Sequence, residues 1–229
     1  MNSKIPVLTI DGPSGSGKGT VGQILAQRLG WHFLDSGALY RALGVTADRA
    51  QVDLGNQAAL ARLAMGMDIR FTPGADGDSV AVMLNGEDVG NILRTEESGR
   101  RASILAAIPD VRRALLQKQH SFRQFPGLVA DGRDMGSTVF PDALLKIYLT
   151  ASPEVRAARR YKQLKEKGFD VNLRRLLDEI RERDARDAER ETSPLKPAFD
   201  ACILDTSQLD ISGVVEHVQG LLQERQRLR

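Results

Sequence analysis

The hydrophobic positions of this chain follow two alternating patterns. Four short runs, KIPVLTI, GLVAD, LLKIYL and ACILDT, are apolar at nearly every position, which is typical of strands buried on both faces of a sheet. WHFL is a candidate for a fifth strand. The segments between these runs place apolar residues at helical spacing, as in KGTVGQILAQRLG with its stripe of Val21, Ile24, Leu25 and Leu29. This alternation predicts an α/β fold in which helices flank both faces of a five-stranded parallel sheet.

The stretch from Asp68 to Val89 departs from this alternation. Its β-like runs, DIRF and SVAVML and a short piece at Glu87 to Val89, are separated by PGADGD and NGE. Gly-Asp and Asn-Gly pairs between such runs favour antiparallel turns. We therefore expect a small antiparallel β insertion at about 68–89.

The remaining segments are predicted to be helical. A helical region at about 95–124 is broken at Pro109, and two highly charged helices follow the LLKIYL strand. The first of these two helices is expected to begin with Ser152 as its N-cap and Pro153 at its first position. Together they predict an arginine-rich helical lid over 153–191, within a single domain that spans 1–229.

Composition narrows the classes of protein to which the chain can belong. Of its 229 residues 27% are charged and 5% aromatic, and the net charge is +2. A nearly neutral chain with few aromatic residues is not typical of a nucleic-acid-binding module. Cys202 is the sole cysteine, so no intramolecular disulfide can form, which fits a reducing compartment. No run is long enough to cross a bilayer, and VLTI is too short for a signal peptide. We expect a soluble, cytoplasmic monomer that binds neither nucleic acid nor membrane.

Residues 11–20 read DGPSGSGKGT and directly follow the first predicted strand. Their Gly-x-x-x-x-Gly-Lys spacing is that of a phosphate-binding loop, in which backbone N–H groups and the start of a helix surround an anion. The usual motif has Ser or Thr directly after the lysine, whereas this chain has Gly19 there and its hydroxyl one residue later. In this respect the loop resembles that of nucleoside monophosphate kinases. The predicted ATP-binding residues of the loop are Gly12, Pro13, Ser14, Gly15, Ser16, Gly17, Lys18, Gly19 and Thr20.

Arginines, rather than histidines, supply the candidate chemistry elsewhere. The three histidines are scattered without metal-ligand or catalytic-triad spacing. Arg183, Arg186 and Arg190 are spaced so that one helical face carries all three, and Asp187 lies four residues after Arg183. Phosphoryl transfer requires positioning and charge neutralisation, which such a cluster can supply. The same segment, taken alone, also fits a solvated helix that is crossed by ion pairs.

The segment GLVADGRDMG carries another candidate group. Its strand ends at Asp131, which resembles the acidic position that acts on Mg²⁺ in phosphate-binding-loop proteins. Asp11 and Asp35 also fall at the ends of predicted strands, where ligands of parallel sheets bind. After Asp131, Arg133 is a candidate for a phosphate and Asp134 for an exocyclic amine. An ordinary polar loop is the alternative interpretation of this segment.

Taken together, GPSGSGKGT, LDSGALYR, ADGRDMG, VFPDA and ERDxRD resemble the bacterial cytidylate kinases. The order and spacing of these motifs extend over nearly the whole chain and include the β insertion. The resemblance implies that the protein transfers the γ-phosphoryl group of ATP, bound with Mg²⁺, to CMP or dCMP. It also implies an acceptor-binding region at 37–105.

The resemblance also implies roles for individual residues. The CMP site would comprise Ser36, Arg41, Ser103, Arg112, Arg133, Asp134, Arg183, Asp187 and Arg190. Arg156 and Arg160 of the lid would join the loop in binding ATP, and Thr20 and Asp131 would act on the metal that ATP carries. The groups expected to act in catalysis are Lys18, Arg133, Arg183 and Arg190.

Two alternatives remain open on the sequence. The first is a kinase of another nucleoside monophosphate, UMP or AMP, which the set Ser103, Arg112 and Asp134 argues against, since an acid suits a 4-amino group. The second is a nucleotide sensor without kinase activity. A GTPase is disfavoured because no Asn-Lys-x-Asp segment follows a strand.

Overall fold

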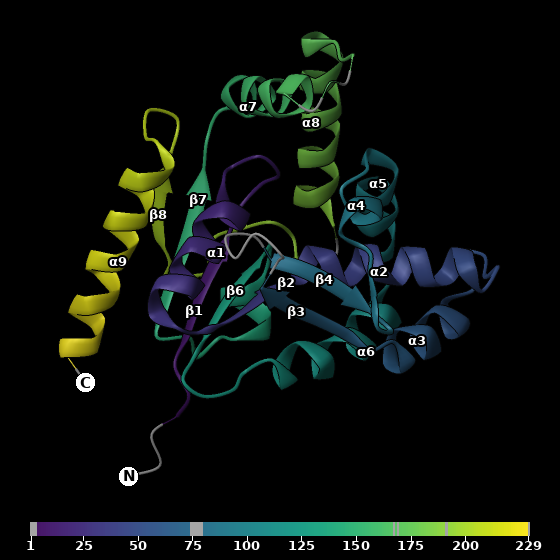
Figure 1. Ribbon diagram of the computed structural model, residues 1–229, viewed down its shortest axis with the longest axis horizontal. Helices are drawn as coiled ribbons and strands as arrows, with labels where there is room; N and C mark the ends of the chain where they lie inside the picture. The colour runs from purple at the N-terminus through teal and green to yellow at the C-terminus, as the bar shows by residue number, and fades with distance from the viewer. Residues whose placement is uncertain (1–3, 74–79, 167, 169, 191, 229) are drawn as a thin grey trace.

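The structure is a computed structural model that describes residues 4–73, 80–166, 168, 170–190 and 192–228. Its centre is a five-stranded, wholly parallel sheet with the strand order β2-β6-β1-β7-β8 (Figure 1). The bounds of these strands are Val7–Asp11 for β1, His32–Asp35 for β2, Leu128–Gly132 for β6, Leu145–Thr150 for β7 and Cys202–Asp205 for β8. The predicted α/β fold is therefore confirmed.

Helices cover both faces of this sheet because its strands alternate their side chains between two apolar cores. Leu8 and Ile10 of β1 belong to the core under α1 (Lys18–Leu29) and α9 (Ile211–Arg227). Val7, one residue before Leu8, belongs to the core on the opposite face. That second core is covered by α2 (Ser36–Arg49), α3 (Gln57–Gly66), α5 (Glu96–Leu105) and α6 (Pro109–Ser121).

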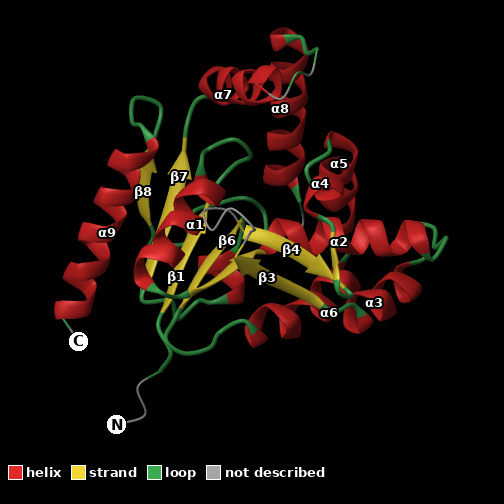
Figure 2. Ribbon diagram, viewed as in Figure 1, coloured by secondary structure: helices red, strands yellow, loops and turns green. Residues whose placement is uncertain are grey.

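The predicted insertion is a three-stranded antiparallel sheet with the order β3-β4-β5 (Figure 2). Its strands are Ile69–Pro73, Val80–Leu84 and Glu87–Asp88, and the short helix α4 (Gly90–Leu93) follows. The predicted Asn85-Gly86 turn has positive φ at both residues, as a tight hairpin requires. The other predicted turn falls on 74–78, outside the described residues. Ile69 and Leu84 are buried in the core that contains α2, so the insertion packs on that face of the main sheet.

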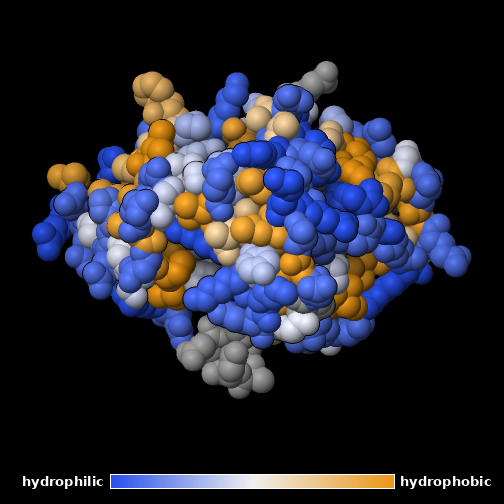
Figure 3. Space-filling view, turned by 90° about the horizontal axis from the view of Figure 1, so that it is seen from above, coloured by the Kyte–Doolittle hydropathy of each residue, from blue (hydrophilic) through white to orange (hydrophobic). Residues whose placement is uncertain are grey.

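Two charged helices, α7 (Pro153–Glu166) and α8 (Leu173–Glu189), pack together beyond the carboxyl ends of the strands (Figure 1). The Ser152 hydroxyl accepts a hydrogen bond from the backbone N–H of Val155, as expected of the predicted N-cap. Seen from this side, the surface is dominated by hydrophilic side chains, with apolar ones in scattered patches (Figure 3). No helix of the described part of the chain has the length and apolar character needed to span a membrane.

Three short elements were not predicted. Helix α3 is capped by Asn56, whose side chain accepts from the N–H of Ala59. Five of its ten residues are small: Ala58, Ala59, Ala61, Ala64 and Gly66. Helix α4 has only four residues. The segment predicted as a loop after Asp134 contains one turn of π-helix, η1 (Met135–Val139).

Candidate active site

A cavity of about 230 Å³ lies at the carboxyl ends of β1, β2 and β6. It is lined by groups from the phosphate-binding loop, the turn after β6, and helices α2, α5, α6 and α8. Lys18 and Asp131 line it, and so do all nine residues predicted for the acceptor: Ser36, Arg41, Ser103, Arg112, Arg133, Asp134, Arg183, Asp187 and Arg190. Lys18 and Arg190, which are 172 positions apart in the sequence, are thus brought into one cavity.

A larger cavity of about 840 Å³ continues from the loop toward the lid. Both cavities share Ser14, Gly15, Lys18 and Gly19, while Gly17, Thr20 and Arg160 line the larger one alone. Of the residues predicted to bind ATP, four line neither cavity: Gly12, Pro13, Ser16 and Arg156. Gly12 and Ser16 are buried in the loop itself.

The loop requires glycine where its backbone turns. Gly12 has φ 147°, and a Cβ there would come within 2.0 Å of the Leu149 carbonyl oxygen, so no other residue fits. Gly17, with φ 91°, is the residue from which helix α1 starts. This geometry directs the first N–H groups of α1 and the side chain of Lys18 toward the two cavities, which suits an anion.

Lys18 is held in a nearly dry position. Its Nζ donates to the Pro13 carbonyl oxygen at 3.2 Å and lies 4.0 Å from Asp131 Oδ1. Burial, together with the nearby charge of Arg133, lowers the pKa of Lys18 to about 8, and Asp131 partly opposes this. An incoming phosphate would supply the negative charge that the site lacks around this ammonium group.

Asp131 is the group best placed to meet a divalent metal. Its Oδ1 is buried without a hydrogen-bond partner in the described part of the chain, and burial raises the pKa of Asp131 to about 7. Asp35 lies opposite it in the sheet register, and Thr20 is exposed beside the larger cavity. The described residues contain no cluster of three or more metal-binding side chains. One or two carboxylates and a hydroxyl fit a magnesium ion that arrives bound to phosphates.

The turn after β6 is fixed by Asp11. The two carboxylate oxygens of Asp11 accept from the backbone N–H groups of Met135 and Gly136, each at 2.8 Å. Asp11 is 5% exposed, and burial raises its pKa to about 6 although these two hydrogen bonds lower it. The clamp sets the position of the two preceding residues, Arg133 and Asp134, at the cavity wall.

An arginine–carboxylate pair closes one end of the smaller cavity. Arg112 Nη2 forms a hydrogen-bonded ion pair with Asp134, and both side chains are about nine-tenths buried. The same nitrogen donates to the Ser193 hydroxyl at 2.8 Å, while Nη1 lies 3.4 Å from the Tyr40 hydroxyl. The pair therefore presents donors and a carboxylate acceptor side by side.

A second group of charges lines the middle of the cavity. Arg133 Nε donates to Asp187 at 2.9 Å, and Arg190 lies 3.7 Å from the other oxygen of that carboxylate. The positive charge of Arg183 is only partly compensated by nearby carboxylates. Burial and the charge of Arg133 lower the pKa of Arg183 to about 10, and its Nε has no hydrogen-bond partner among the described residues. The Nε of Arg41 is also buried without a hydrogen-bond partner among the described residues, although its Nη1 donates to the Leu93 carbonyl. Cationic groups thus exceed carboxylates here, as an anion site requires.

Ser36 and Ser103 supply the neutral polar groups. The Ser36 hydroxyl donates to Gln119 Oε1 at 2.9 Å, and both residues are buried. Ser103 comes from α5 on the opposite wall.

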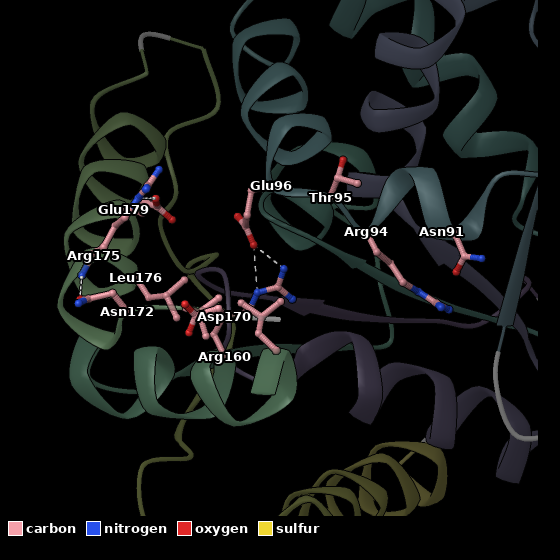
Figure 4. A pocket seen from close by; sticks show the side chains of 12 residues that line it. Asn91, Arg94, Thr95, Glu96, Arg160, Asp170, Asn172, Arg175, Leu176 and Glu179 are labelled. Atoms are coloured by element: carbon pink, nitrogen blue, oxygen red, sulfur yellow. Dashed lines mark hydrogen bonds and ion pairs between the residues drawn. The ribbon is translucent and has the colours of Figure 1, made fainter. Parts of the chain in front are cut away.

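The arginines of the lid differ in what they contact. Arg156 is 3% exposed, and its guanidinium donates to the Ser14 and Ala151 carbonyls and pairs with Asp184 of α8. Arg160 instead reaches from α7 across a cleft to Glu96 of α5, and Figure 4 shows the two side chains pointing toward one another. The role predicted for Arg156 in binding ATP stays a prediction.

One detail of the predicted arginine cluster is wrong. Arg186 does not share the cavity with Arg183 and Arg190: it is exposed, and its Nε donates to the Glu182 carbonyl oxygen. The reason is that Arg183 and Asp187, four residues apart on α8, face the cavity, so Arg186, one residue before Asp187, is turned away from it; Arg190 lines the cavity as the C-cap residue of α8.

Several residues of the site were not singled out by the sequence analysis. Asp11 was noted only as a residue at a strand end, and nothing in the sequence marks Tyr40, Gln119 or Ser193. Each acts through a partner that is distant in the chain. Gln119, for example, accepts from the hydroxyl of Ser36, which lies 83 positions earlier. Side chains of this kind are found only once the fold has brought the partners together.

Comparison with known proteins places the chain in a family. A model of the family described as cytidylate kinase matches residues 8–224. The cytidylate kinase of Pseudomonas putida (strain W619) is 56% identical over 98% of this chain and 99% of its own length. The cytidylate kinase of Pseudomonas paraeruginosa (strain DSM 24068 / PA7) is 57% identical over 95% of both chains. That of Aeromonas hydrophila is 57% identical over 94% of this chain and 93% of its own. The chain belongs to the cytidylate kinase family.

Proposed function

We propose that the protein transfers the γ-phosphoryl group of Mg-ATP to CMP or dCMP, giving ADP and CDP or dCDP. The observation that carries the proposal is that one cavity has a phosphate-binding loop with Lys18 at one wall and the Arg112–Asp134 pair at another. The first feature suits the terminal phosphates of a nucleotide, and the second suits the hydrogen-bonding edge of a base. Both substrates are then held with their phosphates toward each other.

On the donor side, we propose that the loop N–H groups and Lys18 bind the β- and γ-phosphates of ATP. Arg160 of the lid is within reach of the same cavity once it leaves Glu96. Asp131 and Thr20 would hold Mg²⁺ together with the phosphates, and the ion would offset their negative charge. Lys18 needs its proton for this role, and binding of a polyanion favours the protonated form.

On the acceptor side, Arg41, Arg133 and Arg190 bind the CMP phosphate, and Arg183 helps them to neutralise charge as the γ-phosphoryl group moves. No general base is required because the attacking phosphate oxygen is already anionic. The unpartnered Nε atoms of Arg41 and Arg183 support this assignment, since buried donors without a partner are costly unless a ligand satisfies them.

The base is read at the Arg112–Asp134 pair. A cytosine presents a 4-amino donor beside the N3 and O2 acceptors, which match the Asp134 carboxylate and the donors of Arg112 and Ser103. Uracil has a carbonyl in place of the 4-amino group, and this oxygen would face the carboxylate unfavourably. Asp187 and Arg183 are placed to interact with the pentose hydroxyls, with Asp187 as an acceptor.

The lid helices α7 and α8 complete the proposal. Arg183 and Asp187 lie on α8, so movement of α8 and substrate binding are coupled. Closure over both nucleotides would exclude water, which otherwise hydrolyses ATP. We further propose that the enzyme works as a cytoplasmic monomer, because no long apolar stripe that could form a subunit interface stands out in the sequence; light scattering in solution would test the monomer against its 25.1 kDa mass.

The decisive experiment is a coupled assay of ADP release with Mg-ATP and CMP, dCMP, UMP, AMP and GMP in parallel. The Lys18→Ala variant, prepared identically, controls for contaminating kinases and should lose about 100-fold or more in kcat, as for removal of a donor to transition-state charge. Preference for CMP and dCMP would support the proposal. Preference for UMP or AMP would keep a kinase but overturn the reading of the base, and ADP release that is independent of acceptor would indicate an ATPase or a nucleotide sensor.

A further inference from the structure

The segment that leads from α8 to β8 passes over the base end of the cavity. We call its residues 192–201 the strap. Near its start, the N–H of Leu195 donates to the carbonyl oxygen of Asp187 at 2.8 Å, which ties the strap to the last turn of the lid helix α8. Near its end, Asp200 accepts from the buried Lys146 of β7 at 2.7 Å. The strap is therefore attached to the lid at one end and to the sheet at the other.

Ser193 occupies an unusual backbone conformation within the strap. Its φ is 52°, in the left-handed region that residues with a side chain rarely adopt. Such a conformation persists only where the surroundings hold it in place, and it is therefore a reason to examine what the side chain does. Glycine would adopt the same φ without penalty, and this difference allows the backbone and the hydroxyl to be tested separately.

The hydroxyl of Ser193 contacts the arginine of the base pocket. Its Oγ accepts from Arg112 Nη2 at 2.8 Å and lies 3.4 Å from the Thr138 hydroxyl on η1. Arg112 Nη2 has one other partner of this kind, Asp134. Because the Arg112 side chain is only 11% exposed, water has little access to replace the serine.

These contacts determine the orientation of the guanidinium plane. Arg112 Nη1 has weaker partners, the Tyr40 hydroxyl at 3.4 Å and the Ala106 carbonyl at 3.3 Å. Arg112 Nη2 donates to Asp134, which lies in the turn after β6, and to Ser193, which lies in the strap. These two hydrogen bonds at one nitrogen hold the guanidinium in place. Removing the hydroxyl would leave Arg112 held by Asp134 and by the two long contacts of Nη1, so the orientation of its guanidinium plane would be less well defined.

We propose that Ser193 is a specificity-determining positioning residue: it holds Arg112 in the orientation in which Arg112 and Asp134 together read the acceptor base, and it connects that reading to the lid through the strap. The inference rests on the proposed function, because it takes the acceptor base to bind at Arg112 and Asp134. Ser193 acts through Arg112 and not on the transferred phosphoryl group. Its loss therefore affects the choice and binding of the acceptor, and not the binding of ATP.

The test compares Ser193→Gly and Ser193→Ala with the unsubstituted enzyme. Both variants remove the hydroxyl, and only the glycine variant also relieves the backbone conformation. A hydrogen bond to a charged group contributes enough that we expect the KM for CMP to rise about 5–20-fold in both variants. The ratio of kcat/KM for CMP over UMP should fall by a similar factor, while the KM for ATP stays within about twofold. Ser121→Ala is the matched control, because the exposed Ser121 hydroxyl donates to the Lys118 carbonyl oxygen of its own helix and Ser121 does not line the cavity.

A double-mutant cycle with Arg112→Met shows whether Ser193 acts through Arg112. In the Arg112→Met background, Ser193→Gly should change the CMP/UMP ratio by less than twofold, since the group that it positions is gone. Full additivity of the two changes would overturn the proposal.

The possible failures can be told apart. If the unsubstituted enzyme shows no preference for CMP, the proposed function fails and this inference fails with it. If the unsubstituted enzyme prefers CMP and both Ser193 variants keep the same ratio, only the inference about Ser193 is overturned, even if their melting temperatures fall. If Ser193→Ala loses the preference for CMP and Ser193→Gly keeps it, the effect comes from the backbone conformation and not from the hydroxyl. This result would also overturn the inference about Ser193.

Discussion

Gly19 lies against the carboxylate of Asp131, so closely that a Cβ on Gly19 would come within 3.2 Å of Asp131 Oδ2. This position follows Lys18 directly and carries Ser or Thr in the usual phosphate-binding loop. Here a buried carboxylate from the neighbouring strand β6 occupies the space that a side chain would need. The displaced hydroxyl of Thr20 is thus explained by packing: the variant loop makes room for Asp131.

Gly19→Ala should therefore impair the enzyme although alanine favours helices. The new methyl group would press on Asp131, and crowding of this kind typically costs about 1–3 kcal/mol. We expect kcat/KM for ATP to fall by about 10-fold or more, measured at saturating acceptor. Gly220→Ala in α9 is the matched control, since a Cβ there meets nothing within 4 Å; it should keep full activity and raise stability by up to about 1 kcal/mol. Unchanged kinetics of Gly19→Ala would contradict this account of the loop.

Asp134→Asn should exchange the specificity for the base. An amide can donate to the 4-carbonyl of uracil, whereas the carboxylate can only accept. We expect the ratio of kcat/KM for CMP over UMP to fall by about 100-fold, since a well-placed base contact is worth about 1–3 kcal/mol and the exchange affects both bases. The parallel assay with both acceptors measures this ratio directly.

Asp110→Asn is the control for that change. Asp110 is exposed and pairs with Arg113 one turn away on α6, so the same chemical change there should leave both acceptors unaffected. If Asp134→Asn weakens ATP as much as CMP, the carboxylate would have a structural role instead of a role in reading the base.

The outline of the fold and of the site could be predicted from local sequence patterns. The apolar runs of β1 and β6 identify two buried strands of the sheet. The glycine spacing of the loop is typical of a single backbone geometry. Helix α3 was missed although Leu60 and Ala64 are spaced as on a helical face, because it is short and its start is marked only by the Asn56 side chain as N-cap. The π-turn η1 is held by Asp11, 124 residues earlier in the chain, so no local pattern could indicate it.

The arginines illustrate the same limit at the site. Arg156 and Arg160 look alike in the sequence, four residues apart on one predicted helix, and both were assigned to ATP. The structure gives them different surroundings, because only Arg156 faces the loop and Asp184. Sequence spacing shows which charges are available, and packing decides which of them remain free for a ligand.

These different surroundings predict opposite phenotypes for the two arginines. Arg156→Ala would leave the partly exposed Asp184 carboxylate without its buried partner and the Ser14 carbonyl without a donor, and the loss of hydrogen bonds of this kind costs about 1–3 kcal/mol. We expect a fall in melting temperature. Arg160→Ala removes an ion pair at a more exposed position, so it should change stability by about 1 kcal/mol at most.

Kinetics of the same two variants complete the comparison. Arg160→Ala should raise the KM for ATP several-fold with the fold intact, because Arg160 lines the larger cavity. A stable Arg156→Ala enzyme with a raised KM for ATP would show instead that Arg156 leaves Asp184 and binds the nucleotide.

The Asp11 clamp predicts a specific dependence of stability on pH. Burial raises the pKa of Asp11 from its usual 3.8 to about 6, against the opposing effect of the two N–H donors. Between these two values the folded state binds more protons than the unfolded state, so the free energy of unfolding falls as pH rises through this window. Below about pH 4 the carboxyl group is protonated in both states and the penalty for a buried charge vanishes.

Asp11→Asn isolates this effect because the amide does not titrate. Between pH 4 and pH 7 the wild type should lose about 3 kcal/mol relative to the variant, at about 1.4 kcal/mol for each pKa unit. The measurement is chemical unfolding of both proteins without nucleotide, which avoids titration of the CMP phosphate.

The variant keeps one acceptor oxygen and loses the other, so Met135 or Gly136 loses its partner and the turn that carries Arg133 and Asp134 loosens. We therefore expect a variant that gains stability relative to wild type as pH rises and that nevertheless binds CMP more weakly at pH 7. A difference in stability that does not change between pH 4 and pH 7 would mean that Asp11 is not buried as a charge, and the clamp would need another explanation.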